Sequence, residues 1–194
     1  MKYKLLLEDT KIVGDQTLYR IQALKDFSNV KAGDRGGYIR SEKNLSHNYN
    51  AWVYDSAQVY DNAWVYGNAR VYDNAWVSGN AQVSGNAQVY GDVWVYGDAQ
   101  VYGDARVSDS AWVYGNARVY GNAIVENEKE CLSVISHKYS ITITKNHIAI
   151  GCEVHEIKHW SKCIKEIGKM YGYTDNEIRG TILILKGLLL SRKD

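Results

Sequence analysis

Two cysteines and two histidines lie close together in the C-terminal third of this 194-residue chain, in the pattern Cys152-x2-His155-x3-His159-x3-Cys163. Thiolate and imidazole groups are ligands that zinc accepts. Ligands running from His155 to Cys163 on one helix would span about 12 Å at 1.5 Å per residue, too far for one ion. Cys152, His155 and His159 therefore remain the candidate metal ligands. In the alternative interpretation Cys152 is a buried strand residue and the histidines face either solvent or the prism. We predict no cofactor.

Aromatic side chains are the second group that could act. The chain has 6 tryptophans and 16 tyrosines but only 1 phenylalanine, and Trp76, Trp94 and Trp112 are spaced by eighteen residues. Tryptophan and tyrosine are the residues that most often dominate protein interfaces, and their rings also stack on planar ligands. Whether these rings act together depends on the elements that position them.

A repeat of six residues positions them. Thirteen valines recur at this spacing from Val53 to Val125, and alanine lies two residues before each, with Val93 as the exception. Alternation along a strand places the alanine and valine on one side and the residue between them on the other. The Gly-Asn and Asp-Asn pairs that follow are typical of turns. Each unit is therefore expected to form one short strand and one corner.

Three such units close a triangular coil of eighteen residues, and coils stack about 4.8 Å apart through parallel ladders. Thirteen units predict about four coils, and the absence of proline fits ladders that use every backbone N–H. The predicted fold class is all-β dominated, a parallel β-helix shaped as a triangular prism. Trp76, Trp94 and Trp112 then stack on one face, beside Tyr96 and Tyr114.

Caps are expected at both ends, because a solenoid leaves unpaired edges there. Strand-like segments joined through Gly14-Asp15 predict an N-terminal β cap over residues 1–50, and the β-helix follows over 51–126. Residues 127–194 are predicted to form a C-terminal cap of a β-hairpin turning at Lys145-Asn146 and two helices. The second helix begins at Thr174, which forms a capping box with Glu177.

The stacked tryptophans form a larger apolar patch than a monomer normally exposes. One interpretation is that they lie in a trimer interface or under a cap helix. The other is that they form a recognition face, with Asp92 and Asp109 at its rim; in this prediction the corner leading into the face carries an aspartate in every coil, at Asp55, Asp73, Asp92 and Asp109.

The repeat resembles the hexapeptide-repeat, left-handed parallel β-helix superfamily, and the left-handed sense is implied by that resemblance. The whole chain is similar to uncharacterised hexapeptide-repeat proteins encoded by bacteriophages and prophages. The segments that carry this similarity are 18–27, 36–39, 44–47 and 141–152. The resemblance implies a phage origin and a homotrimer.

Many members of the superfamily are acyltransferases that use a histidine as general base. Residues 51–125 contain no histidine, and the candidate base nearest to the repeat is His47. A general base also needs an orienting partner and a substrate cleft. We therefore favour a protein that is not an enzyme over a coenzyme A-dependent acyltransferase with a site at a subunit boundary.

Charge and cysteine usage narrow the partners and the location. Residues 51–125 carry three arginines and seven aspartates, an acidic surface that disfavours nucleic acid. The chain has no apolar run of the roughly 20 residues that span a bilayer, and its three cysteines favour a reducing compartment. We expect a cytoplasmic protein of the bacterial host with no membrane partner.

The residues therefore predict a protein that is not an enzyme and acts by recognition through aromatic faces, and the resemblance implies that it is a phage or prophage protein. An antagonist of host defence, binding a host protein or sequestering a small signalling molecule, fits this description. Besides the acyltransferase, a structural or assembly protein is the second alternative.

Overall fold

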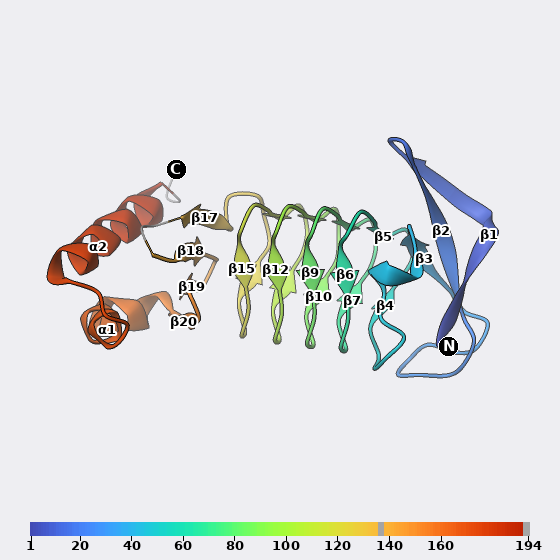
Figure 1. Cartoon of the computed structure of the whole chain (residues 1–194), viewed down its shortest axis with the longest axis horizontal. Coiled ribbons are helices and arrows are strands. Elements are labelled where there is room, and N and C mark those ends of the chain that lie inside the picture. Colours follow the sequence, from blue (N-terminus) through green and yellow to red (C-terminus); the bar gives the residue numbers. More distant parts are fainter. Residues whose placement is uncertain (136–137, 192–194) are drawn as a thin grey trace.

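The chain folds as a β-solenoid with a different cap at each end (Figure 1). The computed structural model describes residues 1–135 and 138–191. Residues 136–137 and 192–194 of the predicted C-terminal cap lie outside the described residues. The fold is mostly β, with two α-helices near the C-terminus, as the sequence predicts.

Thirteen two-residue strands among the described residues form the repeat, one for each valine. They are β4 (Trp52–Val53), β5 (Gln58–Val59), β6 (Trp64–Val65), β7 (Arg70–Val71), β8 (Trp76–Val77), β9 (Gln82–Val83), β10 (Gln88–Val89), β11 (Trp94–Val95), β12 (Gln100–Val101), β13 (Arg106–Val107), β14 (Trp112–Val113), β15 (Arg118–Val119) and β16 (Ile124–Val125). Strands three apart pair in parallel, so the coils have three faces. Every valine of the repeat is buried, and each contributes about 1.5–3 kcal/mol by leaving water.

The parallel ladder begins before the first valine of the repeat. Strand β1 (Tyr3–Val13) forms a hairpin with β2 (Gln16–Ala23), and β2 pairs with β3 (Arg35–Ile39). Strand β3 then pairs in parallel with β5, Ile39 opposite Val59, and Leu45 bridges to Val65. With three rungs to a turn, these two rungs and the thirteen strands make about five turns. The paired residues of these two rungs are twenty residues apart, whereas those of the repeat are eighteen apart. The two rungs therefore do not fit the period of six.

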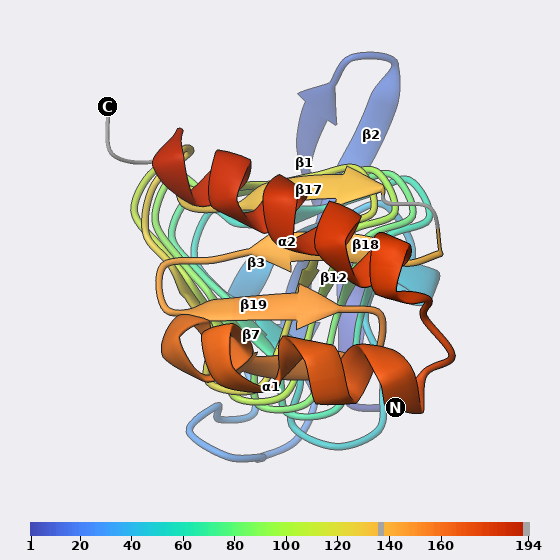
Figure 2. The same ribbon diagram turned by 90° about the vertical axis from the view of Figure 1, so that its left-hand side faces the viewer.

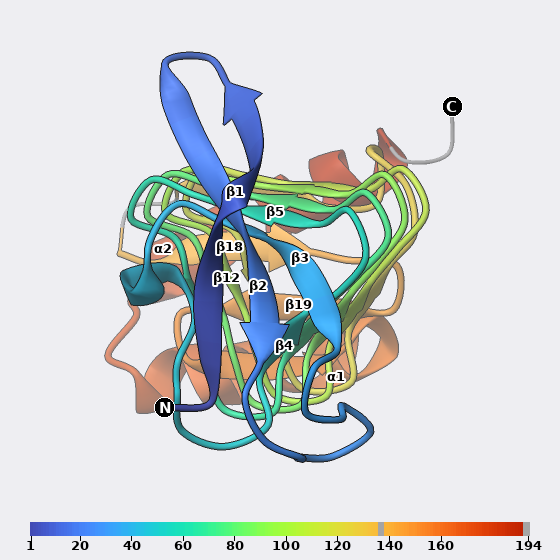
Figure 3. The same cartoon turned by 90° about the vertical axis from the view of Figure 1, so that its right-hand side faces the viewer.

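The junction between β3 and the first coil is tight. A Cβ atom on Gly36 would lie 2.5 Å from the carbonyl oxygen of Val53, so only glycine fits there without a shift of the backbone. The short 3-10 helix η1 (Glu42–Asn44) follows and leads into β4. In Figure 3 the β1–β2 hairpin projects beyond the triangular outline of the coils, on the side of β5.

The C-terminal cap is an antiparallel sheet of β17 (Leu132–Ile135), β18 (Ser140–Ile143), β19 (His147–Ile150) and β20 (Glu153–Glu156). Helices α1 (Ile157–Met170) and α2 (Asp175–Leu190) cover its outer face (Figure 2). The predicted hairpin turn and the capping box of Thr174 are both present. Thr142 Oγ1 accepts from the backbone N–H of Arg118 at 3.0 Å, and Asn146 Oδ1 accepts from that of Ile124 at 3.1 Å. The cap thereby satisfies edge groups of the last coil.

In the part of the chain that the structure describes, neither helix has the length and apolar character needed to cross a lipid bilayer.

Candidate functional site

The predicted tryptophan stack is confirmed. Trp94 lies directly opposite Trp76 and Trp112 in the parallel ladder of β8, β11 and β14. The ring centroids of Trp76 and Trp94 are 4.8 Å apart and those of Trp94 and Trp112 are 6.0 Å apart, with interplanar angles of 17° and 30°. Trp94 remains 43% exposed and Trp112 41% exposed. In this single chain, therefore, no cap helix covers these two rings.

Tyr96 and Tyr114 form a second stack beside the tryptophans. Their centroids are 5.5 Å apart at an interplanar angle of 14°, and Tyr114 is 45% exposed. We use the name tryptophan face for the surface formed by the stacked rings Trp76, Trp94, Trp112, Tyr96 and Tyr114. Because each ring packs on its neighbour above a β-ladder, the face is ordered before any partner arrives.

The two predicted rim aspartates occupy different positions. Asp109 lies at the first corner position with positive φ (57°), as Asp73 does (58°), whereas Gly91 (89°) takes that position in the coil between them. Asp92 instead follows Gly91 and accepts a hydrogen bond from Asn74 Nδ2 at 3.1 Å. The corner therefore carries an aspartate in every coil, but Asp92 occupies the second corner position, after Gly91, where the neighbouring coils carry aspartate first. Both Asp92 and Asp109 are exposed.

The tryptophan row continues across the N-terminal cap. Trp76 lies opposite Gln58, Gln58 opposite Tyr38, and Tyr38 opposite Arg20. The Gln58 side-chain oxygen faces Trp76 and Lys11 when the amide is in the orientation that satisfies its hydrogen bonds. It then accepts from Trp76 Nε1 at 3.1 Å and from Lys11 Nζ at 2.9 Å. The row thus runs from tryptophan rings at one end to cationic groups at the other.

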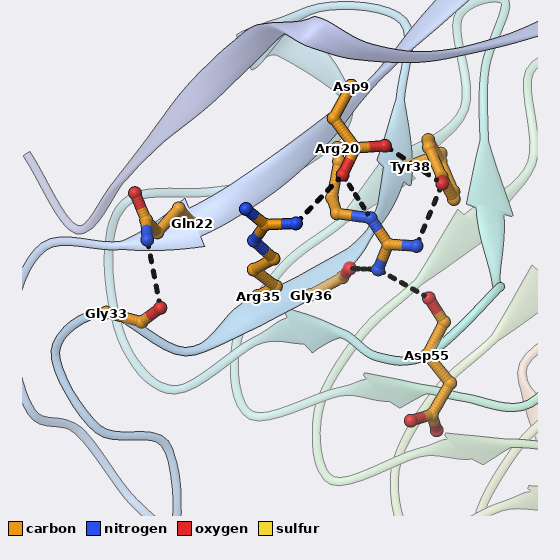
Figure 4. Close-up of polar contacts among 8 residues, drawn as sticks. All are labelled: Asp9, Arg20, Gln22, Gly33, Arg35, Gly36, Tyr38 and Asp55. Carbon is orange, nitrogen blue, oxygen red and sulfur yellow. Dashed lines mark hydrogen bonds and ion pairs between the residues drawn. The ribbon is translucent and has the colours of Figure 1, made fainter.

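The cationic end is held by a network of polar contacts (Figure 4). The Arg20 guanidinium lies 4.5 Å from the centre of the Tyr38 ring and donates to the Tyr38 hydroxyl at 2.8 Å. Arg20 Nε lies 3.0 Å from Asp9 Oδ2, and Arg35 reaches the same carboxylate at 3.5 Å. The sequence does not reveal these residues as a group, because Tyr38 and Gln58 are twenty residues apart and fall outside the eighteen-residue columns. The run Gly36-Gly37-Tyr38 was the signal that could have located them.

His47, the candidate general base, packs within the N-terminal cap. Its ring stacks on Tyr3 with centroids 4.3 Å apart, and its Nδ1 accepts from the backbone N–H of Lys2 at 3.2 Å. Its Nε2 lies 3.7 Å from a Glu42 carboxylate oxygen. These contacts give His47 a packing role, and the cavities described below do not include it.

Two of the candidate metal ligands, Cys152 and His155, are linked by a chain of hydrogen bonds, and the third, His159, contacts the His155 ring. Cys152 Sγ donates to the Tyr171 hydroxyl at 3.4 Å, and that hydroxyl donates to Glu153 Oε1 at 2.6 Å. Glu153 Oε2 lies 2.9 Å from His155 Nε2, and the His155 and His159 rings are 4.5 Å apart. The bonds from Tyr171 and then from His155 lower the pKa of the Glu153 carboxyl. Within residues 1–135 and 138–191, no group of three His, Cys, Asp or Glu side chains is placed to hold one ion.

Comparison with known families supports the repeat fold. The family model described as YdcK beta solenoid repeat matches residues 57–69, 63–79, 81–97, 99–115 and 111–127. A comparison with curated proteins gives no match. The matched residues lie inside the solenoid, so what the family model and the structure establish together is a repeat β-solenoid with aromatic faces.

Proposed function

We propose that this protein is a binding protein, not an enzyme, and that it acts by recognition through the tryptophan face. The observation that carries the proposal is the exposure of Trp94 and Trp112, 43% and 41%, within an ordered ring stack. Large rings held in place lose little conformational entropy on binding and rank among the main contributors to interface energy. Arg20 at the far end of the row adds the third residue type that is enriched at such hot spots.

A protein surface fits the tryptophan face better than a planar small molecule does. The rings of Trp76 and Trp94 already cover one another's faces, at a centroid distance of 4.8 Å. A flat ligand would have to separate them, which the ladder between β8 and β11 opposes. The stack therefore offers its outer edges as an apolar, ribbed surface, which suits apolar side chains of a partner protein.

Two kinds of partner fit this surface. A second and a third copy of this chain would form the homotrimer that the resemblance implies. A protein of a bacterial host would be the target if the chain is of phage origin, and an antagonist of host defence is then the proposed role. The acyltransferase alternative has no observation in its favour, since His47 is engaged in cap packing.

The test compares the double variant Trp94→Ala/Trp112→Ala with the matched variant Trp64→Ala. Trp64 is 42% exposed but lies on another face. Native mass spectrometry of the gently purified protein gives the assembly mass, and three chains of 22.0 kDa each would give 66.0 kDa. We expect the double variant to lose either the trimer or the co-purifying partner, and Trp64→Ala to keep it. The proposal would be refuted if the double variant kept the same oligomeric state and the same co-purifying partner as the wild-type protein.

A further inference from the structure

A notch interrupts a different face of the solenoid, the one formed by β6, β9, β12 and β15. The outward residue after each valine of this face is Tyr66, Ser84, Tyr102 and Tyr120 in successive coils. Ser84 therefore leaves out one ring of a tyrosine column. The result is a cavity of about 170 Å³ lined by Tyr66, Gln82, Ser84, Gln100 and Tyr102, which we call the Ser84 notch.

Each aromatic wall of the Ser84 notch is supported by a second ring. Tyr66 stacks on Trp64 of its own coil, with centroids 4.0 Å apart at 21°. Tyr102 stacks on Tyr120 of the following coil, with centroids 4.7 Å apart at 4°. Neither supporting ring lines the Ser84 notch, so both walls are held from outside it.

The amide groups in the Ser84 notch are available for a ligand. Among the described residues, the side chains of Gln82 and Gln100 have no hydrogen-bonding partner, whereas glutamines of the other faces do. Gln88 accepts from the Tyr72 hydroxyl at 3.2 Å, and Gln58 accepts from Lys11 and Trp76. Each free amide offers one carbonyl acceptor and two N–H donors, which can bind a pair of neighbouring hydroxyl groups.

A second cavity of about 290 Å³ adjoins the Ser84 notch and shares Gln100 with it. Its other lining residues are Asp98, Asn116, Arg118 and Ser140. The Arg118 guanidinium is held by a hydrogen bond to the Gly151 carbonyl at 3.4 Å. The face thus carries two neighbouring polar cavities, the first with aromatic walls and the second with a carboxylate, an amide and a guanidinium.

These groups match the chemistry of a sugar chain. A pyranose ring has apolar C–H faces that pack on aromatic rings and a rim of hydroxyl groups that bond to amides and carboxylates. Tyr66 and Tyr102 are two coils apart, about 10 Å at the usual strand spacing. A flat nucleobase stacked on both walls would need only about 7 Å, twice a van der Waals contact, so a thicker, puckered ring fits better. The Asp98 carboxylate offsets the Arg118 guanidinium, so the second cavity carries no net positive charge that would attract a phosphate group.

We propose that this face binds a short oligosaccharide, with one sugar ring in the Ser84 notch and the next ring in the adjoining cavity. This site is separate from the tryptophan face, so either proposal can fail without the other.

The experiment is saturation-transfer NMR on the full chain with cellotetraose, maltotetraose, chitotetraose and, as a nucleoside, adenosine. At least one of the three sugars should receive saturation from the wild-type protein. Ser84→Tyr restores the ring that the repeat carries at Tyr66 and Tyr102, so it should fold and abolish the signal by filling the notch. Ser78→Tyr makes the same change on the tryptophan face and should leave the signal intact.

Gln100→Leu, which removes the amide shared by both cavities, gives an independent second variant. It should weaken binding at least about tenfold, equivalent to about 1.4 kcal/mol. The proposal would be overturned if none of the three sugars received saturation from the protein, or if adenosine alone did. A Ser84→Tyr protein that is folded by circular dichroism and binds the sugar like wild type would also overturn it.

Discussion

Trp64 and Trp94 are almost equally exposed, 42% and 43%, yet their surroundings differ. Among the residues that the structure describes, Trp64 contacts one ring, that of Tyr66, whereas Trp94 lies between Trp76 and Trp112. A single exposed ring is common on protein surfaces, while a run of ordered rings is a feature of binding sites. At the residue scale it is therefore the neighbours of Trp94, and not its exposure alone, that support a role in recognition.

Lys2 is a second residue whose surroundings have a measurable effect. It is buried, and its Nζ donates to the Ala51 carbonyl at 2.7 Å. Burial, with a smaller effect from Lys25, lowers the pKa of Lys2 from 10.5 to about 8. The unfolded chain then binds more protons than the folded chain between these two pKa values, so the free energy of unfolding rises with pH across that window.

We expect urea unfolding to show this rise, on the order of 1 kcal/mol, between about pH 7.5 and pH 9.5. Lys2→Met should lack this rise in the free energy of unfolding. Subtracting the values of the variant from those of the wild type removes the contribution of other groups that titrate in the same pH range. Equal pH dependence in both proteins would show that the Lys2 ammonium is not strained by burial.

Two glycines should respond to alanine with opposite signs. At Gly36 a new Cβ would meet the Val53 carbonyl oxygen at 2.5 Å and Ile21 Cγ1 at 2.7 Å, whereas at Gly180 it would meet nothing within 4 Å. Gly36→Ala is therefore expected to lower the free energy of unfolding by about 1–3 kcal/mol or more. Gly180→Ala, in the interior of α2, should raise it by about 0.5–1 kcal/mol. Chemical denaturation measures both, and a neutral Gly36→Ala would contradict the close packing of β3 on the first coil.

At the scale of elements, the period of six was enough to predict each strand of the repeat, because the alternation of buried valine and outward residue leaves one register for every coil. The caps were predicted less completely. Ile39 and Leu45 extend the ladder by two rungs, but a two-residue insertion before Val53 removes them from the period. The link from Trp76 through Gln58 to Lys11 also could not be read from spacing, since it depends on how the β1–β2 hairpin folds back.

The capping box of α2 provides a test at this scale. Thr174 Oγ1 accepts from the backbone N–H of Glu177 at 3.3 Å, and Glu177 Oε2 accepts from that of Thr174 at 2.7 Å. Thr174→Ala should cost about 1 kcal/mol, while Glu177→Gln keeps both bonds and should cost much less. The exchange rates of the α2 backbone amides measure this loss of stability. Equal rates in both variants would mean that the cap does not limit the opening of α2.

On the scale of the whole molecule, the described residues form two separate hydrophobic cores. One extends from Tyr3 through the solenoid to Cys131, and the other joins Ile141, Ile143 and Ile148 to Trp160, Ile164 and Leu185. The solenoid core is continuous through every coil, whereas the second core lies wholly within the C-terminal cap. This arrangement places the tryptophan face on the part of the protein with the continuous core.

We expect native-state hydrogen exchange to follow these two cores. Backbone amides of the coils, such as Trp94 N–H bonded to the Ala111 carbonyl at 3.0 Å, should exchange by global opening. Amides of β18, β19 and the two helices should open together at a lower free energy, as a separate cooperative unit. A single exchange class across both cores would contradict this division.

If a partner covers Trp94 and Trp112, hydroxyl-radical footprinting will detect the loss of exposure at these two rings. Oxidation of these two residues is measured against Trp64 by mass spectrometry, first in the purified single chain and then in the cells that make the protein. Since the three rings are exposed to 41–43% in the chain alone, they should oxidise at similar rates in the isolated monomer. In the cell, Trp94 and Trp112 should be protected while Trp64 is not, and equal oxidation of all three would contradict the account.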